Sequence, residues 1–152
     1  MTEATGVTET KLIESYRGAV YPWHCDHMNH MNVMWYVGKF DEATWNFFLQ
    51  IGLTPSFLRA NNRGMAAVDQ RIAYLNELHA GDTVAVRTGA IEVGTKSLKF
   101  FHEMRNCENN EVAAITQLTA VHMDTVARKS TPLPPDVAAR VREQMSDYKL
   151  PW

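Results

Sequence analysis

The chain has 152 residues, of which 45% are hydrophobic, and this is enough for one domain with a core of its own. Its formal net charge is −2, so the basic surplus with which nucleic-acid-binding proteins neutralise phosphates is missing. No stretch approaches the roughly 18 consecutive apolar residues that a membrane span requires. These properties predict a single domain over residues 11–152 that binds neither nucleic acid nor a membrane.

The N-terminus and the cysteines indicate the compartment. The first residues have neither the basic nor the apolar region of a secretory signal, and residues 1–10 are polar, so we expect them to form a flexible N-terminus. The only two cysteines, Cys25 and Cys107, are read most simply as thiols in a reducing environment. We therefore expect a cytoplasmic protein.

The N-terminal half reads as a strand, a polar loop and two helices. Residues 11–22 have the pattern of a strand and end at a proline, and the loop WHCDHMNH follows at 23–30. Asn32 is a typical N-cap residue. Apolar residues then recur at steps of three and four over 33–51, before a glycine that can end the helix. A threonine followed by a proline predicts a second, short helix over 55–60.

The C-terminal half changes to the period of strands. Four strands are expected, at residues 65–75, 83–93, 97–105 and 111–124. Turn-forming residues separate them, and Gly89 inside the second of these strands suggests a bulge or bend. Val137, Val141 and Met145 mark a short amphipathic helix at the end. One long helix cannot cover both faces of a five-stranded sheet, and this argues for an oligomer.

One segment carries a resemblance to a known family. DHMNHMNVMWYVGKFDEA, at 26–43, resembles the same region of hot-dog thioesterases of the 4-hydroxybenzoyl-CoA thioesterase type. That family has Asp-x-x-Gly-His-(aliphatic)-Asn-x-x-x-Tyr at the start of its long helix, followed by an acidic residue. The matching residues are Asp26, His30, Met31, Asn32, Tyr36 and the pair Asp41-Glu42. Downstream, HAGDTVAV, GTKSLKFFHEM and VHMDTVARKSTPLP resemble later elements of the family in the right order. The family's glycine is Asn29 here, a residue that tolerates positive φ.

The resemblance implies a fold and a reaction. The fold is α+β, with a long central helix wrapped by a five-stranded antiparallel sheet. Two copies would join at a sheet edge and share two pockets, so a homodimer or homotetramer is expected. The reaction would be hydrolysis of a small-molecule acyl-CoA to a free acid and coenzyme A. It needs no metal or redox cofactor, since coenzyme A is part of the substrate.

The resemblance also assigns the catalytic groups. Asp26 would be the catalytic carboxylate, acting as nucleophile on the thioester or as general base on a water. The backbone amide of Val33, at the positive end of the helix, would stabilise the oxyanion. An aspartate in a polar loop can also be a mere turn-former, so that reading stays open. Glu42 on the helix is a backup carboxylate, and its other reading is a solvent-exposed ion pair.

Further residues are candidates for binding the substrate. The motif residues His30, Asn32 and Tyr36 would lie near the acyl group, and Ser97 in TKSLKF near the pantetheine arm. Lys96 is a candidate for the coenzyme's phosphates. Other basic residues could meet phosphates or simply face solvent: Lys99, Arg63, Arg71, Arg128 and Lys129.

The residues around Asp26 allow two more readings. The run His24, Cys25, Asp26, His27 and His30 lacks the second half of a zinc site, so no metal is expected. Five aromatic residues are close in sequence: Tyr21, Trp23, Trp35, Tyr36 and Trp45. They could line a pocket for an aromatic acyl group, hold a cationic one through cation–π contacts, or pack in a core or interface.

Two other functions remain open. A hot-dog hydratase or dehydratase would require an Asp/His pair in a helix-entry motif followed by a glycine-rich approach, and nothing in the sequence matches that combination. A non-catalytic acyl-CoA-binding protein would retain the ligand without turnover. The slight acidity of the chain favours coenzyme A over an acidic acyl carrier protein as the carrier, while the acyl group itself stays open.

Overall fold

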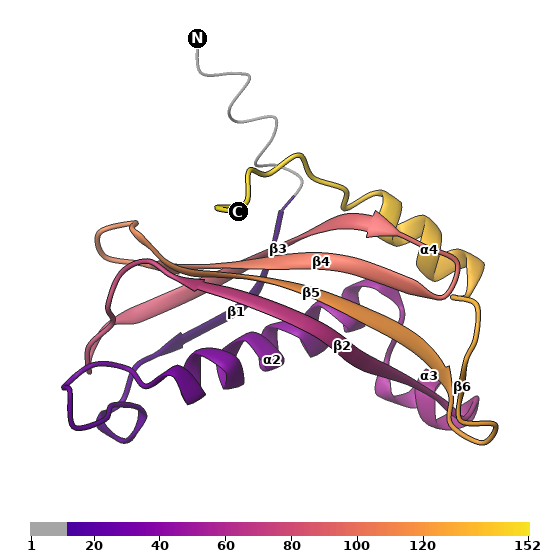
Figure 1. Cartoon of the computed structure of the whole chain (residues 1–152), viewed down its shortest axis with the longest axis horizontal. Coiled ribbons are helices and arrows are strands. Elements are labelled where there is room, and N and C mark those ends of the chain that lie inside the picture. The colour runs from indigo at the N-terminus through magenta and orange to yellow at the C-terminus, as the bar shows by residue number, and fades with distance from the viewer. Residues whose placement is uncertain (1–11) are drawn as a thin grey trace, which may run out of the picture.

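The structure, a computed structural model, describes residues 12–152 as one curled antiparallel sheet against a long helix (Figure 1). The prediction of a flexible segment at 1–10 lies outside the described residues. The strands are β1 (Ile13–Ala19), β2 (Arg63–Tyr74), β3 (Thr83–Val93), β4 (Ser97–Asn106), β5 (Val112–Asp124) and β6 (Lys129–Ser130). The helices are η1 (Pro22–His24), α2 (Val33–Ile51), α3 (Pro55–Ala60) and α4 (Pro135–Arg142).

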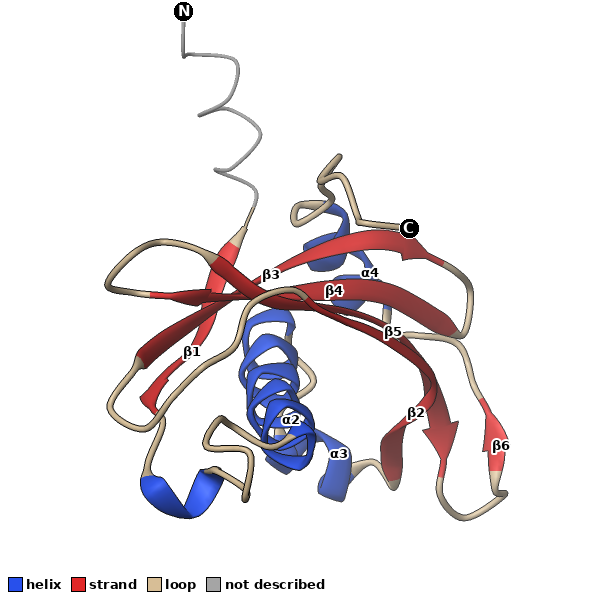
Figure 2. Ribbon diagram, turned by 60° about the vertical axis from the view of Figure 1, so that its left-hand side comes forward, coloured by secondary structure: helices blue, strands red, loops and turns tan. Residues whose placement is uncertain are grey.

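The sheet has the order β1-β3-β4-β5-β2, and every neighbouring pair is antiparallel. The short β6 pairs with β5. Helix α2 lies in the concave face of the sheet, whereas the C-terminal segment passes over the other side (Figure 2). The α+β hot-dog architecture expected from the sequence is therefore confirmed, with a sixth, two-residue strand that the sequence did not predict.

Helix α2 has the predicted bounds, and its ends show why. The side chain of Asn32 accepts a hydrogen bond from the amide of Met34 at 2.9 Å, and Gly52 ends the helix with φ 97°. Between them, large apolar side chains are buried at steps of three and four, as one face of a helix requires: Tyr36, Phe40, Ala43, Phe47 and Ile51.

A buried polar chain joins α2 to the sheet. His102, which has no exposed surface, contacts Thr44 Oγ1 of α2 at 2.8 Å and Thr88 Oγ1 of β3 at 2.6 Å. Thr88 in turn contacts Ser15 Oγ of β1 at 2.7 Å. Burial lowers the pKa of His102 to about 3, so the ring is neutral. Because each of these polar groups has a partner, the chain fixes the helix against the sheet without an unpaired buried charge.

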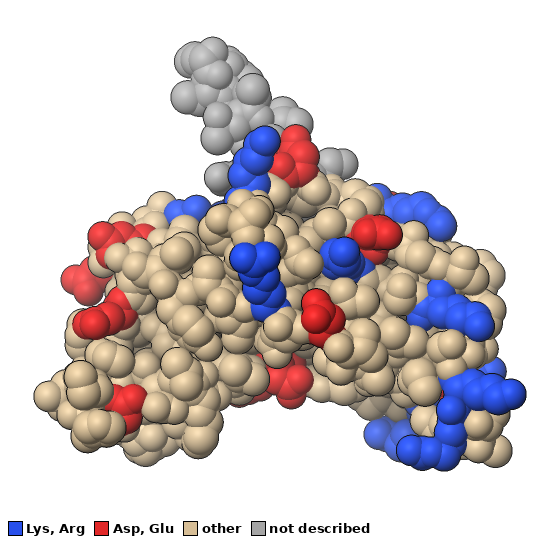
Figure 3. Space-filling model, viewed as in Figure 1, with Lys and Arg blue, Asp and Glu red and all other residues tan. Residues whose placement is uncertain are grey.

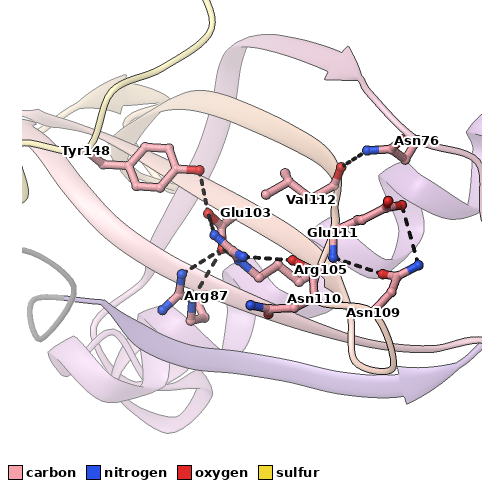
Figure 4. Close-up of polar contacts among 9 residues, drawn as sticks. All are labelled: Asn76, Arg87, Glu103, Arg105, Asn109, Asn110, Glu111, Val112 and Tyr148. Atoms are coloured by element: carbon pink, nitrogen blue, oxygen red, sulfur yellow. Dashed lines mark hydrogen bonds and ion pairs between the residues drawn. The ribbon is translucent and has the colours of Figure 1, made fainter. Parts of the chain in front are cut away.

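The outer face of the sheet carries a second buried polar cluster. Glu103, fully buried, accepts hydrogen bonds from Arg87, Arg105 and Tyr148 (Figure 4). Burial alone would raise the pKa of Glu103, but the hydrogen bonds from Arg105, Tyr148 and Arg87 outweigh it and hold the pKa below its usual value. This carboxylate is therefore charged and paired.

The segment after α4 covers this outer face. The backbone of Ala90 in β3 exchanges hydrogen bonds with Gln144 and Ser146, and the ring of Tyr148 stacks on Phe101 at 4.6 Å. At the end of the chain the Trp152 indole donates to Gln117 at 3.2 Å and lies 4.5 Å from the guanidinium of Arg71. Part of the sheet face that the long helix leaves uncovered is therefore covered by the chain's own C-terminal segment.

Three sequence-based details are wrong. Gly89 is in register with Phe101, and the register shift falls between Ala90 and Glu92. Gly89 is required for a different reason, because an added Cβ would lie 2.8 Å from the Phe101 ring. The last helix ends at Arg142, so Met145 lies beyond it, and the first strand is shorter than 11–22. No helix within residues 12–152 is long and apolar enough to cross a membrane.

Candidate active site

The loop before α2 is a small closed structure. Cys25 and Met31 form an isolated antiparallel bridge, and the amide of Asp26 donates to the carbonyl of His30 at 3.2 Å. The turn requires a left-handed residue, and Asn29 supplies it with φ 66°. The expectation that asparagine could replace the family's glycine at this turn is confirmed. The amide of Met31 is tied to the carbonyl of Leu78 at 2.7 Å, which fixes the loop to the sheet.

Asp26 projects its carboxylate toward the start of α2. One oxygen accepts from the amide of Met28 at 2.9 Å, and the other accepts from the side-chain amide of Asn32 at 2.7 Å. These two hydrogen bonds, that from Asn32 first, lower the pKa of Asp26 below its ordinary value. The carboxylate is therefore ionised at neutral pH.

Asn32 also joins this carboxylate to the helix N-terminus. Its side-chain oxygen accepts from the amide of Met34, and its backbone carbonyl accepts from the amide of Trp35 at 2.9 Å. No hydrogen-bond acceptor within residues 12–152 contacts the amide of Val33. The first turn of α2 thus presents one free N–H group, on the residue that follows the one holding Asp26.

A groove of about 210 Å³ opens beside this amide. It lies between the start of α2 and the end of β2 and includes Val33, Tyr36, Tyr74, Leu75 and Glu77 in its lining, together with His30. The ring of Tyr36 meets that of Tyr74 edge to face, with centroids 5.2 Å apart. His30 Nε2 is 3.9 Å from the Glu77 carboxylate at the rim. The predicted residues His30, Val33 and Tyr36 are therefore brought together in one groove.

The residues that form the other wall of the groove were not predicted from the sequence. Tyr74 and Leu75 end the strand predicted over 65–75 and Glu77 follows it, in a stretch without a recognisable motif. Their role depends on the register that pairs β2 with β5, which places Tyr74 opposite Ala114. Tyr74, an aromatic residue at the end of the strand, was the one local indication in the sequence that this stretch could line a groove.

Lys96 and Ser97 lie at the opposite end of the sheet from the Asp26 loop. They follow β3, whose first residues adjoin the end of β1 and the Asp26 loop. Ten residue steps along β3 separate the two ends by about 33 Å. Ser97 begins β4, and its carbonyl accepts a hydrogen bond from the amide of Gly94 in the β3–β4 turn at 2.8 Å. Within one chain these two residues do not meet the groove.

Glu42 is exposed on α2, nine residues after Val33. At 1.5 Å per residue, it lies about 14 Å further along the helix axis. A thioester carbonyl that contacts the Val33 amide would therefore be too far from the Glu42 carboxylate of the same chain. Asp26 is the carboxylate adjacent to the free amide.

The histidines of the loop do not converge. His24 is buried against Trp35, with ring centroids 4.5 Å apart. Its Nδ1 accepts from the amide of Tyr21 at 2.9 Å, and burial lowers its pKa. His27 is exposed. Within residues 12–152 no three histidine, cysteine or acidic side chains gather as metal ligands would.

Charge is distributed unevenly over the surface. Figure 3 shows lysine and arginine side chains gathered at the end of this face that carries the β5–β6 turn, with acidic side chains more frequent at the opposite end. Arg128 lies in this turn and Lys129 begins β6, and Arg63 pairs with Asp124 beside them at 3.3 Å. These basic residues are at the other end of the molecule from the Asp26 loop.

Comparison with known proteins points to one family. A family model described as "Thioesterase-like superfamily" matches residues 20–141. The chain is 24% identical over 132 residues to a betainyl-CoA thioesterase of Pseudomonas aeruginosa, with 87% of this chain and 83% of the relative covered. It is 29% identical over 110 residues to an L-carnitine dehydrogenase/betainyl-CoA thioesterase of Agrobacterium fabrum. That match covers 72% of this chain but spans only 22% of the length of the relative.

The fold is also found among solved structures. A Staphylococcus aureus protein, solved in complex with CoA, superposes with a TM-score of 0.84 at 19% identity. The superposition covers 92% of this chain and 89% of the other. At this identity the likeness supports the fold alone, and it includes the curled sheet and the long helix described above.

Proposed function

The chain belongs to the thioesterase-like superfamily and is a thioester hydrolase, and from this premise we propose that Asp26 and the Val33 amide carry out the hydrolysis of an acyl-CoA. One observation carries the proposal. The only described amide of the first helical turn without an acceptor follows directly on Asn32, the residue that holds the Asp26 carboxylate. An anionic catalyst and an oxyanion donor thus stand side by side.

The chemistry requires little else. Asp26 either attacks the thioester carbon, which forms an anhydride and expels the coenzyme A thiolate, or takes a proton from a water that attacks instead. In the first route water then hydrolyses the anhydride. In both routes the carbonyl oxygen gains negative charge, and the N–H of Val33 donates to it. No metal or redox cofactor enters the proposed reaction.

Asn32 acts as a positioning residue in this proposal. Its side chain spans the gap between the carboxylate and the helix, with its amide nitrogen on Asp26 and its oxygen on the amide of Met34. Because the same side chain caps the helix, the carboxylate and the free amide are held in a fixed relation.

We propose betainyl-CoA as the first substrate to test. The two relatives reported above carry betainyl-CoA thioesterase in their names, and one of them is covered over most of its length. The groove beside Val33 offers aromatic rings and a carboxylate, which suit the trimethylammonium group of a betainyl ester. The carrier would be coenzyme A and not an acyl carrier protein.

We also propose that two copies pair through β2. This strand ends the order of the sheet, and its middle, from Ala67 to Arg71, is exposed. Antiparallel pairing of two such strands would bring the basic end of one copy, with Arg63, close to Tyr74 and the groove of the other. Basic side chains could then reach the phosphates of coenzyme A. Sedimentation analysis of the active species tests this pairing, and a monomer with full activity would contradict it.

The proposed reaction is tested by thiol release from a panel of acyl-CoAs. Wild type, Asp26→Asn and Glu42→Gln are compared, with the thiol reagent checked against Cys25 and Cys107. We expect wild type and Glu42→Gln to hydrolyse at least one substrate, and Asp26→Asn to lose turnover. Loss in Glu42→Gln alone would move the carboxylate to the helix.

Two further results would select the other functions. Tight binding of acyl-CoA without thiol release, throughout the panel, would favour a binding protein. Loss of the enoyl-CoA absorbance without thiol release would favour a hydratase.

A further inference from the structure

The groove beside Val33 has two aromatic walls at right angles. The ring of Tyr36, from α2, is buried, and that of Tyr74, from the end of β2, is half exposed. Their planes meet at 87° with centroids 5.2 Å apart. Two rings in this arrangement form an aromatic corner. A cation over the face of a tyrosine is attracted by the ring quadrupole, and quaternary ammonium groups are bound in proteins by such rings.

The charges nearest to the groove are negative. Glu77 lines it, and Asp82 is close enough to act on the same ring. Burial, together with the neighbouring Tyr74, Glu77 and Asp82, raises the pKa of Tyr36 to about 12. No lysine or arginine is found among the described residues that line the groove. A cationic group therefore gains from the local field, and an anionic acyl group would be repelled.

Two histidines lie near the Glu77 carboxylate at the rim of the groove. His30 Nε2 lies 3.9 Å and His79 Nε2 3.6 Å from the two oxygens of Glu77. These two histidines are the basic side chains that the Glu77 carboxylate approaches.

From these observations we infer that the groove selects acyl groups with a permanent positive charge, and that Tyr74 and Glu77 determine this specificity. The inference rests on the proposed hydrolysis at Val33, because it places the acyl group in the groove next to that amide. It goes further, since it attributes the recognition of charge, as distinct from size, to two residues outside the family motif. Neutral acyl groups of the same shape fit the groove but lack the attraction.

An isosteric pair of substrates tests the inference. Betainyl-CoA and 3,3-dimethylbutanoyl-CoA have nearly the same shape, but a carbon atom in the second replaces the charged nitrogen of the first. The specificity constant kcat/KM is measured for both with wild type, Glu77→Gln and Tyr74→Leu. Glu108→Gln, which removes an exposed carboxylate from the β4–β5 turn, is the matched control.

We expect wild type and Glu108→Gln to prefer the cationic ester by about tenfold or more. Glu77→Gln and Tyr74→Leu should reduce this preference, because kcat/KM for the cationic ester should fall more than kcat/KM for the neutral ester. Equal hydrolysis of both esters by wild type would overturn the inference and leave the proposed function intact. A preference that both variants retain would also overturn it. Hydrolysis of neither ester, nor of any other acyl-CoA, would overturn the proposed function as well.

Discussion

Two carboxylates of this protein occupy contrasting surroundings. Glu103, on the outer face of the sheet, is fully buried and accepts hydrogen bonds from two guanidinium groups and a phenol. Asp26, in the loop before α2, is partly exposed and accepts one hydrogen bond on each oxygen. Both have lowered pKa values. The difference is that groups of the protein occupy the hydrogen-bonding capacity of Glu103, whereas Asp26 can still accept a hydrogen bond from a substrate.

The same contrast applies to the groups around them. Close to Glu103 the donors are held by the carboxylate, and the C-terminal segment excludes water. Close to Asp26 the amide of Val33 has no acceptor among the described residues, and a groove opens beside it. A satisfied polar cluster holds the fold together, and an unsatisfied donor at an open groove is available for chemistry. Variants of the two regions can test this division of roles between stability and catalysis.

The largest effect should come from the free amide. Val33→Pro removes the N–H group at the first position of α2, where proline suits a helix, and Asn32 already has the extended conformation that precedes proline. We expect kcat to fall by about 10²- to 10³-fold, as for the loss of an oxyanion donor. Steady-state kinetics measure this effect. Val33→Ala keeps the amide and controls for the side chain, so equal losses in the two variants would argue against an oxyanion role.

The buried carboxylate should matter for stability. Glu103→Gln removes the buried charge that accepts hydrogen bonds from Arg87 and Arg105, and we expect the free energy of unfolding to fall by about 3 kcal/mol. The folded fraction should keep its kcat. Urea unfolding and kinetics on the same sample measure both quantities. A Glu103→Gln variant that unfolds like wild type but has lost its activity would reverse the roles that we assign to the two carboxylates.

Mild acid should weaken the fold through His102. Its pKa is about 3 in the folded protein and about 6.5 when unfolded, so the unfolded chain binds the proton first. The stability is complete above pH 6.5 and decreases as the pH falls through the interval from 6.5 to 3. We expect a loss of about 2 kcal/mol between pH 6.5 and pH 5. His24, whose pKa is also lowered, acts in the same direction.

Urea unfolding at several pH values measures this loss, and a non-titrating variant isolates its source. His102→Gln keeps a polar side chain between Thr44 and Thr88 but cannot bind a proton in this range. The dependence on pH should become shallower by the contribution of one histidine. An unchanged dependence would show that His102 is accessible to protons in the folded state.

A smaller effect is expected in the loop of Asp26. Asn29 has φ 66°, which costs a residue with an ordinary Cβ about 1 kcal/mol, whereas glycine adopts it freely. Asn29→Ala should therefore be less stable than wild type by about this amount, and Asn29→Gly should be close to wild type. Thermal unfolding of the three proteins tests the ranking. If alanine were tolerated as well as glycine, the turn would not depend on positive φ.

The sequence predicted the local elements of this fold well, because their signals are local. Helix α2 and helix α3 have the predicted bounds, since a capping residue or a proline begins each of them and Gly52 ends the first. Strand β3 also has the predicted bounds, and β4 and β5 differ from the prediction by one residue each. Asn29 adopts a positive φ, which the sequence indicated only as a conformation that asparagine tolerates.

Long-range features were beyond the sequence. No pattern in the chain indicates that Tyr148 covers Glu103, or that the last residue lies against Arg71 at the far edge of the sheet. The groove depends on the pairing of β2 with β5, which alone brings Tyr74 to the start of α2. Ser97 matched a motif by sequence and Lys96 precedes it, yet the topology places both at the opposite end of the chain's sheet from Asp26. Cytoplasmic location stays a prediction.

The most direct test of the central claim is a crystal structure with a non-hydrolysable acyl-CoA analogue, in which a methylene group replaces the thioester sulfur. We predict that its carbonyl oxygen lies about 3 Å from the amide nitrogen of Val33. The Asp26 carboxylate should approach the carbonyl carbon within about 3.5 Å, or hold a water at that distance. A carbonyl bound away from both groups, beside Glu42 for example, would contradict the assignment of Asp26 and Val33 as the catalytic pair.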